Sequence, residues 1–399
     1  MITKFVFIVF VIFSFATTSL AQSRSKKLEV AYSKNVETYF LAELLAVDHR
    51  IKNKNWEEFK RKECSSYQPI VKAAIDELNH LKGDDIAFKT AALNDTLMSY
   101  GFGNDVMMDP LLYHKEFPNK DYLPGYQFKS THLDKKRQKE VEKIIRNYIE
   151  QLNSFYQAKN INSFFKKHQI FYKGAINEVS KYVKEDITTK MENFYGQKKQ
   201  KYFVLVSPMM MWPIEDNEGR GIGANVKLSE GEIVYEIMSP YVRVNTAGIR
   251  EQYEHFGFDY KPRAQSLTVH EFGHSFVNYE VEKYNFRINK SDSLFTDKLK
   301  KAMSSKGVGS WQVYIIESLV RLGEIRVAEL QNDKYRAEAL RKYHVSQEHF
   351  IFLPSLENKI KEYEKNRKHY PTFNRFMPKL LEVFESSNMK FVNESLQKQ

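Results

Sequence analysis

The sequence predicts an α+β fold: a mostly helical amino-terminal region packs on a core with a small mixed sheet, and a helical cap follows. Helical periodicity of apolar residues runs through residues 30–195. Short aromatic and β-branched runs first appear after residue 200, and helical patterns return from about residue 335. The predicted segments are a leader at 1–21, a helical region at 22–195, a core at 196–335 and a helical cap at 336–399.

The helices of the first region follow from apolar spacing and from residues that start or stop helices. Pro69 favours the first turn of a helix that Gly83 ends. The clearest helix begins near Asp134, and its Lys and Glu residues lie opposite one apolar stripe. That stripe consists of Val141, Ile144, Ile145, Tyr148, Leu152 and Phe155. The section 101–125 shows no clear period and predicts loops.

Three strands are predicted between residues 200 and 240. Tyr202–Val206 is a short aromatic and β-branched run closed by Ser207 and Pro208. Apolar residues at 233, 235 and 237 alternate with Glu232 and Glu236 in a second strand. The run 221–226 is interpreted as an edge strand, whose glycines at 221 and 223 would let another backbone approach closely.

The first residues have the order of a secretory signal peptide. Lys4 precedes an apolar run from residue 5 to 15, and a small-residue site ends at Ala21. An uncleaved membrane anchor is the alternative, but the run is short for a span, which needs roughly 20 residues. The sequence therefore predicts export to the periplasm or the medium, with no stable membrane span after cleavage.

Cysteine count and charge limit the partners and the source of stability. Cys64 is the single cysteine, so an intrachain disulfide is impossible, and an exported chain must then rely on its core, a metal or both. The formal charge of +11 comes from lysines spread along the chain. Without a Gly-rich RNA motif or zinc-finger spacing, this charge does not predict a nucleic-acid partner.

The segment 267–277 contains the pattern His-Glu-x-x-His. On an α-helix His270 and His274 share a face, so both rings can bind one zinc ion. Glu271 follows the first histidine and is the predicted catalytic general base. The alternative is a pair of surface histidines without a metal. Gly273 costs about 1 kcal/mol in a helix interior and is expected to let another backbone pass close by.

A catalytic zinc needs a third protein ligand and an open position. The glycine and third histidine that one class of zinc protease carries further along this helix are missing, since Val277 and Glu280 stand there. Glu317 lies in an apolar stretch of a helix predicted over 311–330, where a buried carboxylate is costly unless paired or metal-bound. Glu317 is therefore the predicted third ligand, the gluzincin arrangement.

The surroundings of Glu317 leave two alternatives open. Arg321 lies one turn on and can hold the free carboxylate oxygen, and a plain helical pair of Glu317 and Arg321 without a metal is the alternative. Glu324, a further turn along, is the other candidate third ligand.

The expected chemistry is hydrolysis of a peptide or protein substrate. Zinc acidifies water, and Glu271 takes its proton and returns it to the leaving amine. The developing oxyanion needs a further donor, for which Tyr314, Arg321, Tyr343 and His344 are candidates. An extended peptide is hypothesised to pair with the edge strand at 221–225.

The motif segments resemble those of bacterial exported proteins grouped as domain of unknown function 4932. The resemblance rests on Val269–Asn278 and Glu317–Arg321, and on the tail segments Tyr363–Arg367, Tyr370–Phe373 and Phe376–Pro378. It covers most of the mature chain and is most specific at the two metal segments. Such proteins look like gluzincin zinc peptidases with a zincin-like core, while the resemblance implies nothing about the substrate.

Two other function classes fit the same motif. One is a non-catalytic binding or cell-surface protein that zinc stabilises, and the other is a zinc hydrolase of a non-peptide amide. A structural zinc site has no use for the carboxylate of Glu271 and usually closes with a fourth protein ligand. The sequence leaves open the oligomeric state, and whether the first region inhibits or binds substrate.

Overall fold

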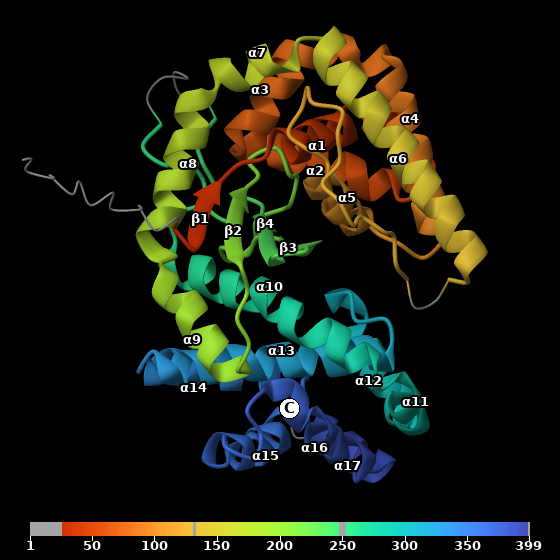
Figure 1. The fold of residues 1–399 in the computed structure, drawn as a ribbon. Coiled ribbons are helices and arrows are strands. Elements are labelled where there is room, and N and C mark those ends of the chain that lie inside the picture. The colour runs from red at the N-terminus through yellow and green to blue at the C-terminus, as the bar shows by residue number, and fades with distance from the viewer. Residues whose placement is uncertain (1–25, 131–132, 247–252, 398–399) are drawn as a thin grey trace, which may run out of the picture.

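The computed structural model describes residues 26–130, 133–246 and 253–397, and it confirms the α+β prediction. Helices surround one four-stranded mixed sheet with the order β1-β2-β4-β3 (Figure 1). The predicted leader lies outside the described residues. The strands are β1 (Leu28–Ala31), β2 (Lys201–Val206), β3 (Gly221–Leu228) and β4 (Gly231–Met238).

The sheet joins the start of the predicted helical region to the predicted core, because β1 comes from the first and the other strands from the second. β1 pairs in parallel with β2, and β2 in parallel with β4, while β3 runs antiparallel to β4 at the edge. Strands β2, β3 and β4 confirm the three predicted strands. β1 was not predicted, because four residues are too few to show a period of two. The predicted segment boundaries themselves stay a prediction.

Alternation along the strands gives the sheet two apolar faces. Tyr202, Val204 and Val206 of β2 face one core, whereas Leu205 faces the other. Amino-terminal helices pack on the Leu205 face, and α8 and α9 run down beside the sheet (Figure 1). These helices are α1 (Lys34–Ala46), α2 (Lys54–Tyr67), α3 (Pro69–Leu78), α4 (Asp85–Ser99), α5 (Met108–Tyr113), α6 (Lys135–Ala158), α7 (Ile161–Lys167), α8 (Gln169–Tyr182) and α9 (Glu185–Tyr195).

The opposite face is covered by α10 (Lys261–Glu282), and α13 (Trp311–Leu330) packs on α10 from the far side of the sheet (Figure 1). This layer order buries α10 between a sheet and a helix. The remaining helices, which lie around and beyond α13, are α11 (Asn285–Ile288), α12 (Asp297–Met303), α14 (Lys334–Lys342), the π-helical turn Tyr343–Gln347, α15 (Leu353–Lys365), α16 (Phe373–Glu385) and α17 (Met389–Gln397).

Local signals placed several helix ends correctly. Asp134 caps α6 by accepting the backbone N–H of Arg137, and Pro69 occupies the first turn of α3. The helix after Pro69 continues as a 3₁₀ turn to Gly83, the predicted stop. The loop prediction for 101–125 is wrong in part, because α5 forms there. The other 3₁₀ turns are Val47–His49, Asn104–Met107, Asn289–Leu294 and Ser304–Lys306.

Two further sequence inferences bear on stability and membranes. Cys64 is buried in the amino-terminal core, and burial raises the pKa of its thiol to about 12. Within the described ranges, none of the helices has both the length and the apolar character that crossing a bilayer requires.

Candidate metal centre

Helix α10 brings the two histidines to one face. Its first turn carries Pro262, and apolar residues such as Phe272 and Phe276 bury its length against the sheet and α13. His270 and His274 are one turn apart, and their side chains are 19% and 17% exposed. Both rings are therefore shielded yet reachable.

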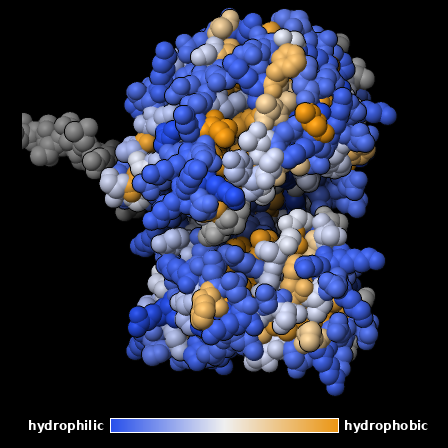
Figure 2. Space-filling view, turned by 90° about the vertical axis from the view of Figure 1, so that its right-hand side faces the viewer, coloured by the Kyte–Doolittle hydropathy of each residue, from blue (hydrophilic) through white to orange (hydrophobic). Residues whose placement is uncertain are grey.

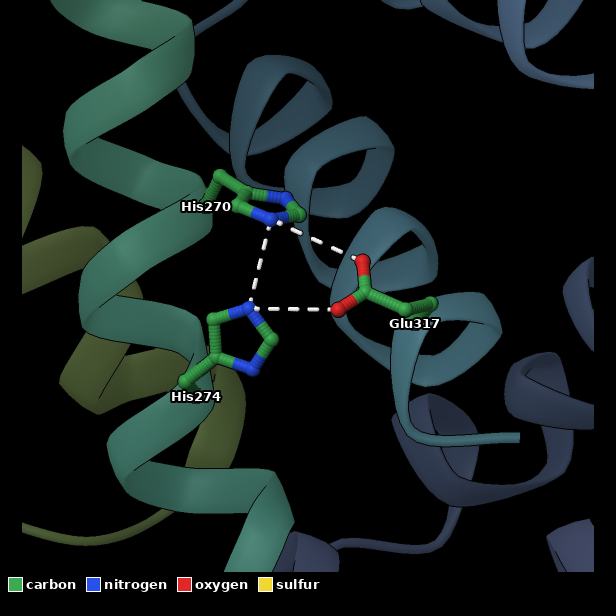
Figure 3. A group of neighbouring side chains, drawn as sticks. All are labelled: His270, His274 and Glu317. Carbon is green, nitrogen blue, oxygen red and sulfur yellow. Dashed lines mark hydrogen bonds and ion pairs between the residues drawn. The ribbon is translucent and has the colours of Figure 1, made fainter. Parts of the chain in front are cut away.

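Helix α13 supplies the acidic partner. Ser310 caps it by accepting the backbone N–H of Val313, and Glu317 points from its second turn toward α10 (Figure 3). Gly273 lets the helices approach, since a Cβ there would lie 3.2 Å from Cγ1 of Val320. The expectation that a backbone passes Gly273 is wrong, because the nearest atoms belong to the side chains of Val320 and Tyr195.

Three ligand atoms converge in the space between these helices. Nε2 of His270 and Nε2 of His274 are 3.2 Å apart, and each lies 3.6 Å from one carboxylate oxygen of Glu317 (Figure 3). Ligands at the corners of a tetrahedron about 2.0–2.1 Å from a zinc ion would be about 3.3 Å apart. The donor set thus fits a small divalent ion in both atom type and spacing.

The other ring nitrogens are held from outside. Nδ1 of His270 donates to Glu324 at 2.8 Å, and Nδ1 of His274 donates to the amide oxygen of Asn278 at 2.9 Å. Carrying hydrogen on Nδ1, each neutral ring presents a lone pair at Nε2. Two lone pairs facing each other at 3.2 Å repel unless a cation or a proton lies nearby. Glu324 lies on the Nδ1 side, so the structure does not support it as the third ligand.

A continuous chain of charged groups links the ligands behind the site. Arg321 pairs with Glu317, as the sequence predicted, and its Nε donates to Glu348 at 2.8 Å. His344 lies 2.7 Å from Glu348 through Nδ1 and 3.3 Å from Glu324 through Nε2. Because every carboxylate here has a cationic or histidine partner, the ligand geometry is held on all sides.

Charge shifts the pKa values of these groups away from what burial alone would give. Burial raises the pKa of Glu317, but the charges of Arg321 and the two histidines outweigh it and lower the pKa to about 2. Burial likewise lowers the pKa of His270, but the hydrogen bond and charge of Glu324 and the charge of Glu317 raise it to about 9. The site therefore has a strong affinity for positive charge.

Glu271 lies beside the edge strand. Its residue is 7% exposed, and it lines a cavity together with His270. A Cβ at Gly221 would lie 2.6 Å from Cγ of Glu271, and one at Gly223 would lie 3.0 Å from its backbone oxygen. The predicted approach of another backbone is confirmed at Gly223, whereas at Gly221 the approaching group is the side chain of Glu271.

The four oxyanion-donor candidates are placed very differently. Tyr314 is fully buried; its hydroxyl donates to the His349 carbonyl and accepts the Ile351 N–H. It therefore faces the carboxy-terminal core, and its candidacy is withdrawn. Arg321 is engaged by Glu317 and Glu348.

Tyr343 and His344 stand on the π-helical turn and line the same cavity as Glu271. The Tyr343 hydroxyl donates to Glu218 at 2.8 Å, and the ring of His344 is held by Glu324 and Glu348. Of the four candidates, Tyr343 has the fewest interactions, because its donor group contacts Glu218 alone among the described residues.

Two cavities flank the ligand set, and Figure 2 shows a hollow between the upper and lower halves of the molecule. The first, which we call the His270 cavity, measures about 480 Å³ and extends toward the start of α10 and α14. The second, the His274 cavity, measures about 610 Å³ and extends along the end of α10 toward α5. Gly221 borders the first cavity and Gly223 borders the second, so neighbouring positions of β3 line the two cavities.

Only part of the β3 edge is open to pairing. The backbone N–H of Asn225 donates to Asp109 at 2.9 Å, and that of Lys227 donates to the Tyr113 hydroxyl at 2.7 Å. Peptide groups of alternate residues point to the same edge, so those of Gly221 and Gly223 face this edge too. The expectation of an open edge at 221–225 is therefore corrected to 221–223, because α5 covers the rest.

A second acidic cluster could also hold a cation by distance alone. Glu178, His255 and Asp259 lie close together. Both oxygens of Glu178 accept backbone N–H groups, from Phe256 and Phe258, at 2.8 Å. Because these oxygens already have donors, the Glu178 cluster stabilises a turn.

Sequence reasoning missed several residues of the site. Asn278 stands four residues after His274, a helical spacing that could have identified it. The His344 and Glu348 pair has the same spacing. Asp109, Tyr113 and the partner of Tyr343 gave no local signal, because they come from distant segments.

Comparison with known proteins gives one match. A family model described as a domain of unknown function (DUF4932) matches residues 129–383, a span that contains α10 and α13. No curated protein and no solved structure matches the chain.

Proposed function

The chain belongs to the family of the domain of unknown function DUF4932, and on that premise we propose that it is a zinc-dependent metalloprotease of the gluzincin type with a zincin-like core. The proposal rests on one observation: Nε2 of His270, Nε2 of His274 and the carboxylate of Glu317 converge at 3.2–3.6 Å with Glu271 alongside. These three residues would hold the zinc ion, and Glu271 would act on water.

Each residue has a distinct part in the proposed hydrolysis. Zinc supplies Lewis acidity, which makes water a strong nucleophile near neutral pH. Glu271 accepts the proton of the attacking water and returns it to the leaving amine. The Tyr343 hydroxyl gives up its hydrogen bond to Glu218 and donates to the developing oxyanion instead. An extended peptide pairs with the open edge at Gly221–Gly223.

Metal analysis combined with a protease assay tests this proposal. We expect about one zinc per chain in the wild type and in Glu271→Ala. A mixture of peptides from digested proteins should be cleaved only by the wild type, as followed by mass spectrometry. Glu140→Ala removes an exposed carboxylate on α6 and is the matched control with unchanged activity.

The outcomes separate the three function classes. Absence of bound metal, or equal cleavage by wild type and Glu271→Ala, would remove the mechanism. Bound zinc without cleavage of any peptide would favour the non-catalytic protein or the hydrolase of a non-peptide amide. A library of acylated amines distinguishes those two, since only the hydrolase releases amine.

Export is part of the same proposal. Expression of the full chain in a bacterium should yield a mature protein outside the cytoplasm that begins at Gln22. Mass spectrometry of its first peptide checks this cleavage site. An intact Met1 in membrane fractions would instead indicate an uncleaved anchor.

A further inference from the structure

The His270 cavity contains two arginines that the proposed hydrolysis does not use. Arg263 lies in the first turn of α10, and Arg336 lies in the first turn of α14. Both line the cavity together with His270 and Glu271. The cavity thus combines the proposed catalytic base with two guanidinium groups.

Neither guanidinium has a carboxylate within 4.0 Å among residues 26–130, 133–246 and 253–397. Arg263 donates to the carbonyl oxygen of Gly219, and its buried Nε has no partner there. Arg336 donates to the side-chain oxygens of Gln265, at 2.8 Å, and Gln331, and its buried Nε also has no described partner. Neutral partners orient these two groups without forming an ion pair with them, so their N–H groups can still pair with an anion.

The third arginine of the cavity shows the contrast. Arg321 is neutralised by Glu317 and Glu348, whose charges raise its pKa despite burial. Burial instead lowers the pKa of Arg336, because the charges of Asp333, Glu324 and Asp186 only partly offset the loss of solvent. A partly buried guanidinium that has no carboxylate within ion-pair distance is a favourable place for an anion to bind.

Three of the five described acids that line the same cavity are engaged, and the other two are Asp216 and the proposed base Glu271. Glu324 is held by His270 and His344, and Glu348 by His344 and Arg321. Glu218 accepts the hydroxyl of Tyr343 on the exposed turn that precedes β3. Apolar side chains provide one part of the wall, namely Pro262, Leu267, Ala339 and Leu340, and Asn217, Tyr260 and Ser266 also line it.

We propose that the His270 cavity is a substrate subsite that selects a carboxylate, with Arg263 and Arg336 as the specificity-determining residues. The apolar wall accommodates a short aliphatic stem, and the planar forks can bind a carboxylate with two hydrogen bonds. This inference rests on the proposed protease function. The carboxylate comes either from a Glu or Asp side chain or from the free carboxyl end of a peptide, and both sources share this chemistry.

Matched peptides test the subsite in the zinc-loaded enzyme. Internally quenched peptides carry Glu, Gln or Leu at one position at a time around the scissile bond, each with a free or an amidated carboxyl end. We expect kcat/KM to be at least about tenfold higher for Glu than for Gln at one position, because the amide leaves the arginine charge unpaired. If the peptide end is the source, amidation causes the loss instead.

Variants identify the residues responsible. Arg263→Gln and Arg336→Gln should each reduce the preference for carboxylate over amide to less than about twofold, and Arg336→Lys should retain part of it because the charge stays. Two separate arginines keep the test decisive if one variant misfolds, which circular dichroism and zinc content reveal. Arg137→Gln on α6 is the control, since that side chain is 63% exposed and remote.

A binding measurement separates this inference from the proposed function. Calorimetry of zinc-loaded Glu271→Gln with the Glu and Gln forms of one peptide requires no turnover. Selective binding of the Glu form without cleavage by the wild type would keep the subsite and remove the protease. Cleavage and binding without any preference for a carboxylate, unchanged in both arginine variants, would overturn the subsite alone.

Discussion

Two glutamates, one on each side of the sheet, are held in opposite ways: Glu37 is fully buried, and the side chain of Glu317 is 17% exposed. Glu37 of α1 lies in the amino-terminal core, where the hydroxyls of Ser207 and Tyr172 and the backbone N–H of Met209 donate to it. Burial outweighs these hydrogen bonds and raises the pKa of Glu37 to about 7. Glu317, on the far side, has its pKa lowered to about 2 by Arg321 and the histidines.

The difference shows what each region is built for. Neutral donors orient Glu37 but do not replace lost hydration, so the amino-terminal core keeps it protonated until near neutral pH. Arg321 and the neighbouring histidines lower the pKa of Glu317, and the histidines lower that of Glu324, so both stay ionised at ordinary pH values. Of the two arrangements, the second keeps a negative charge at neutral pH, which suits the proposed metal site.

The largest expected effect comes from removing the cation of the metal region. Arg321→Met leaves Glu317 and Glu348 without their arginine and should destabilise the metal-free protein by about 3–5 kcal/mol. Urea unfolding measures the change. Arg326→Met is the matched control on the same helix, because Glu357 keeps Arg341 as a partner and Glu364 is 30% exposed. Equal losses in the two variants would contradict the contrast.

The second prediction concerns pH and the amino-terminal core. Because Glu37 has a raised pKa, the folded state binds its proton more tightly than the unfolded state, and stability falls as pH rises from about 4.5 to 7. The loss from this group is about 3 kcal/mol. Glu37→Gln should remove that part of the pH dependence in urea unfolding at a series of pH values. An identical slope in wild type and variant would disprove it.

A third prediction compares the two outer partners of the histidines. Glu324→Gln replaces a charged acceptor of His270 and should weaken zinc binding about 10–100-fold. Asn278→Ala removes only a neutral acceptor of His274 and should weaken it less. Competition with a chromophoric chelator measures both affinities. Equal effects would show that the charge of Glu324 is not what matters.

The smallest expected effect tests the edge strand that separates the two cavities. Gly221→Ala places a Cβ against Glu271 and should reduce kcat about tenfold while zinc content stays unchanged. Gly309→Ala is the control, since a Cβ there meets no atom within 4 Å. Peptide cleavage and metal analysis of the same preparations check both points. Full activity in Gly221→Ala would mean that Glu271 can move without consequence.

The parts predicted from sequence are those with local causes. His270 and His274 share a face because they are four residues apart, and the pair of Glu317 and Arg321 follows from the same spacing on a second helix. The cost of burying a lone carboxylate pointed to Glu317. Strand β1 was missed because four residues carry too little pattern, and Tyr314 was misplaced because its position in the α13 sequence does not reveal which face is buried.

The sequence by itself determined the α+β class, the two motif helices and the donor atoms on them, because helix periodicity and ligand chemistry are local properties. Only the tertiary structure decided that Glu317 rather than Glu324 meets Nε2 of both rings, that α5 covers the β3 edge beyond Gly223, and that Arg263 and Arg336 share a cavity with Glu271. Those outcomes depend on how separate segments pack, and no short-range pattern encodes the distance between side chains on different helices.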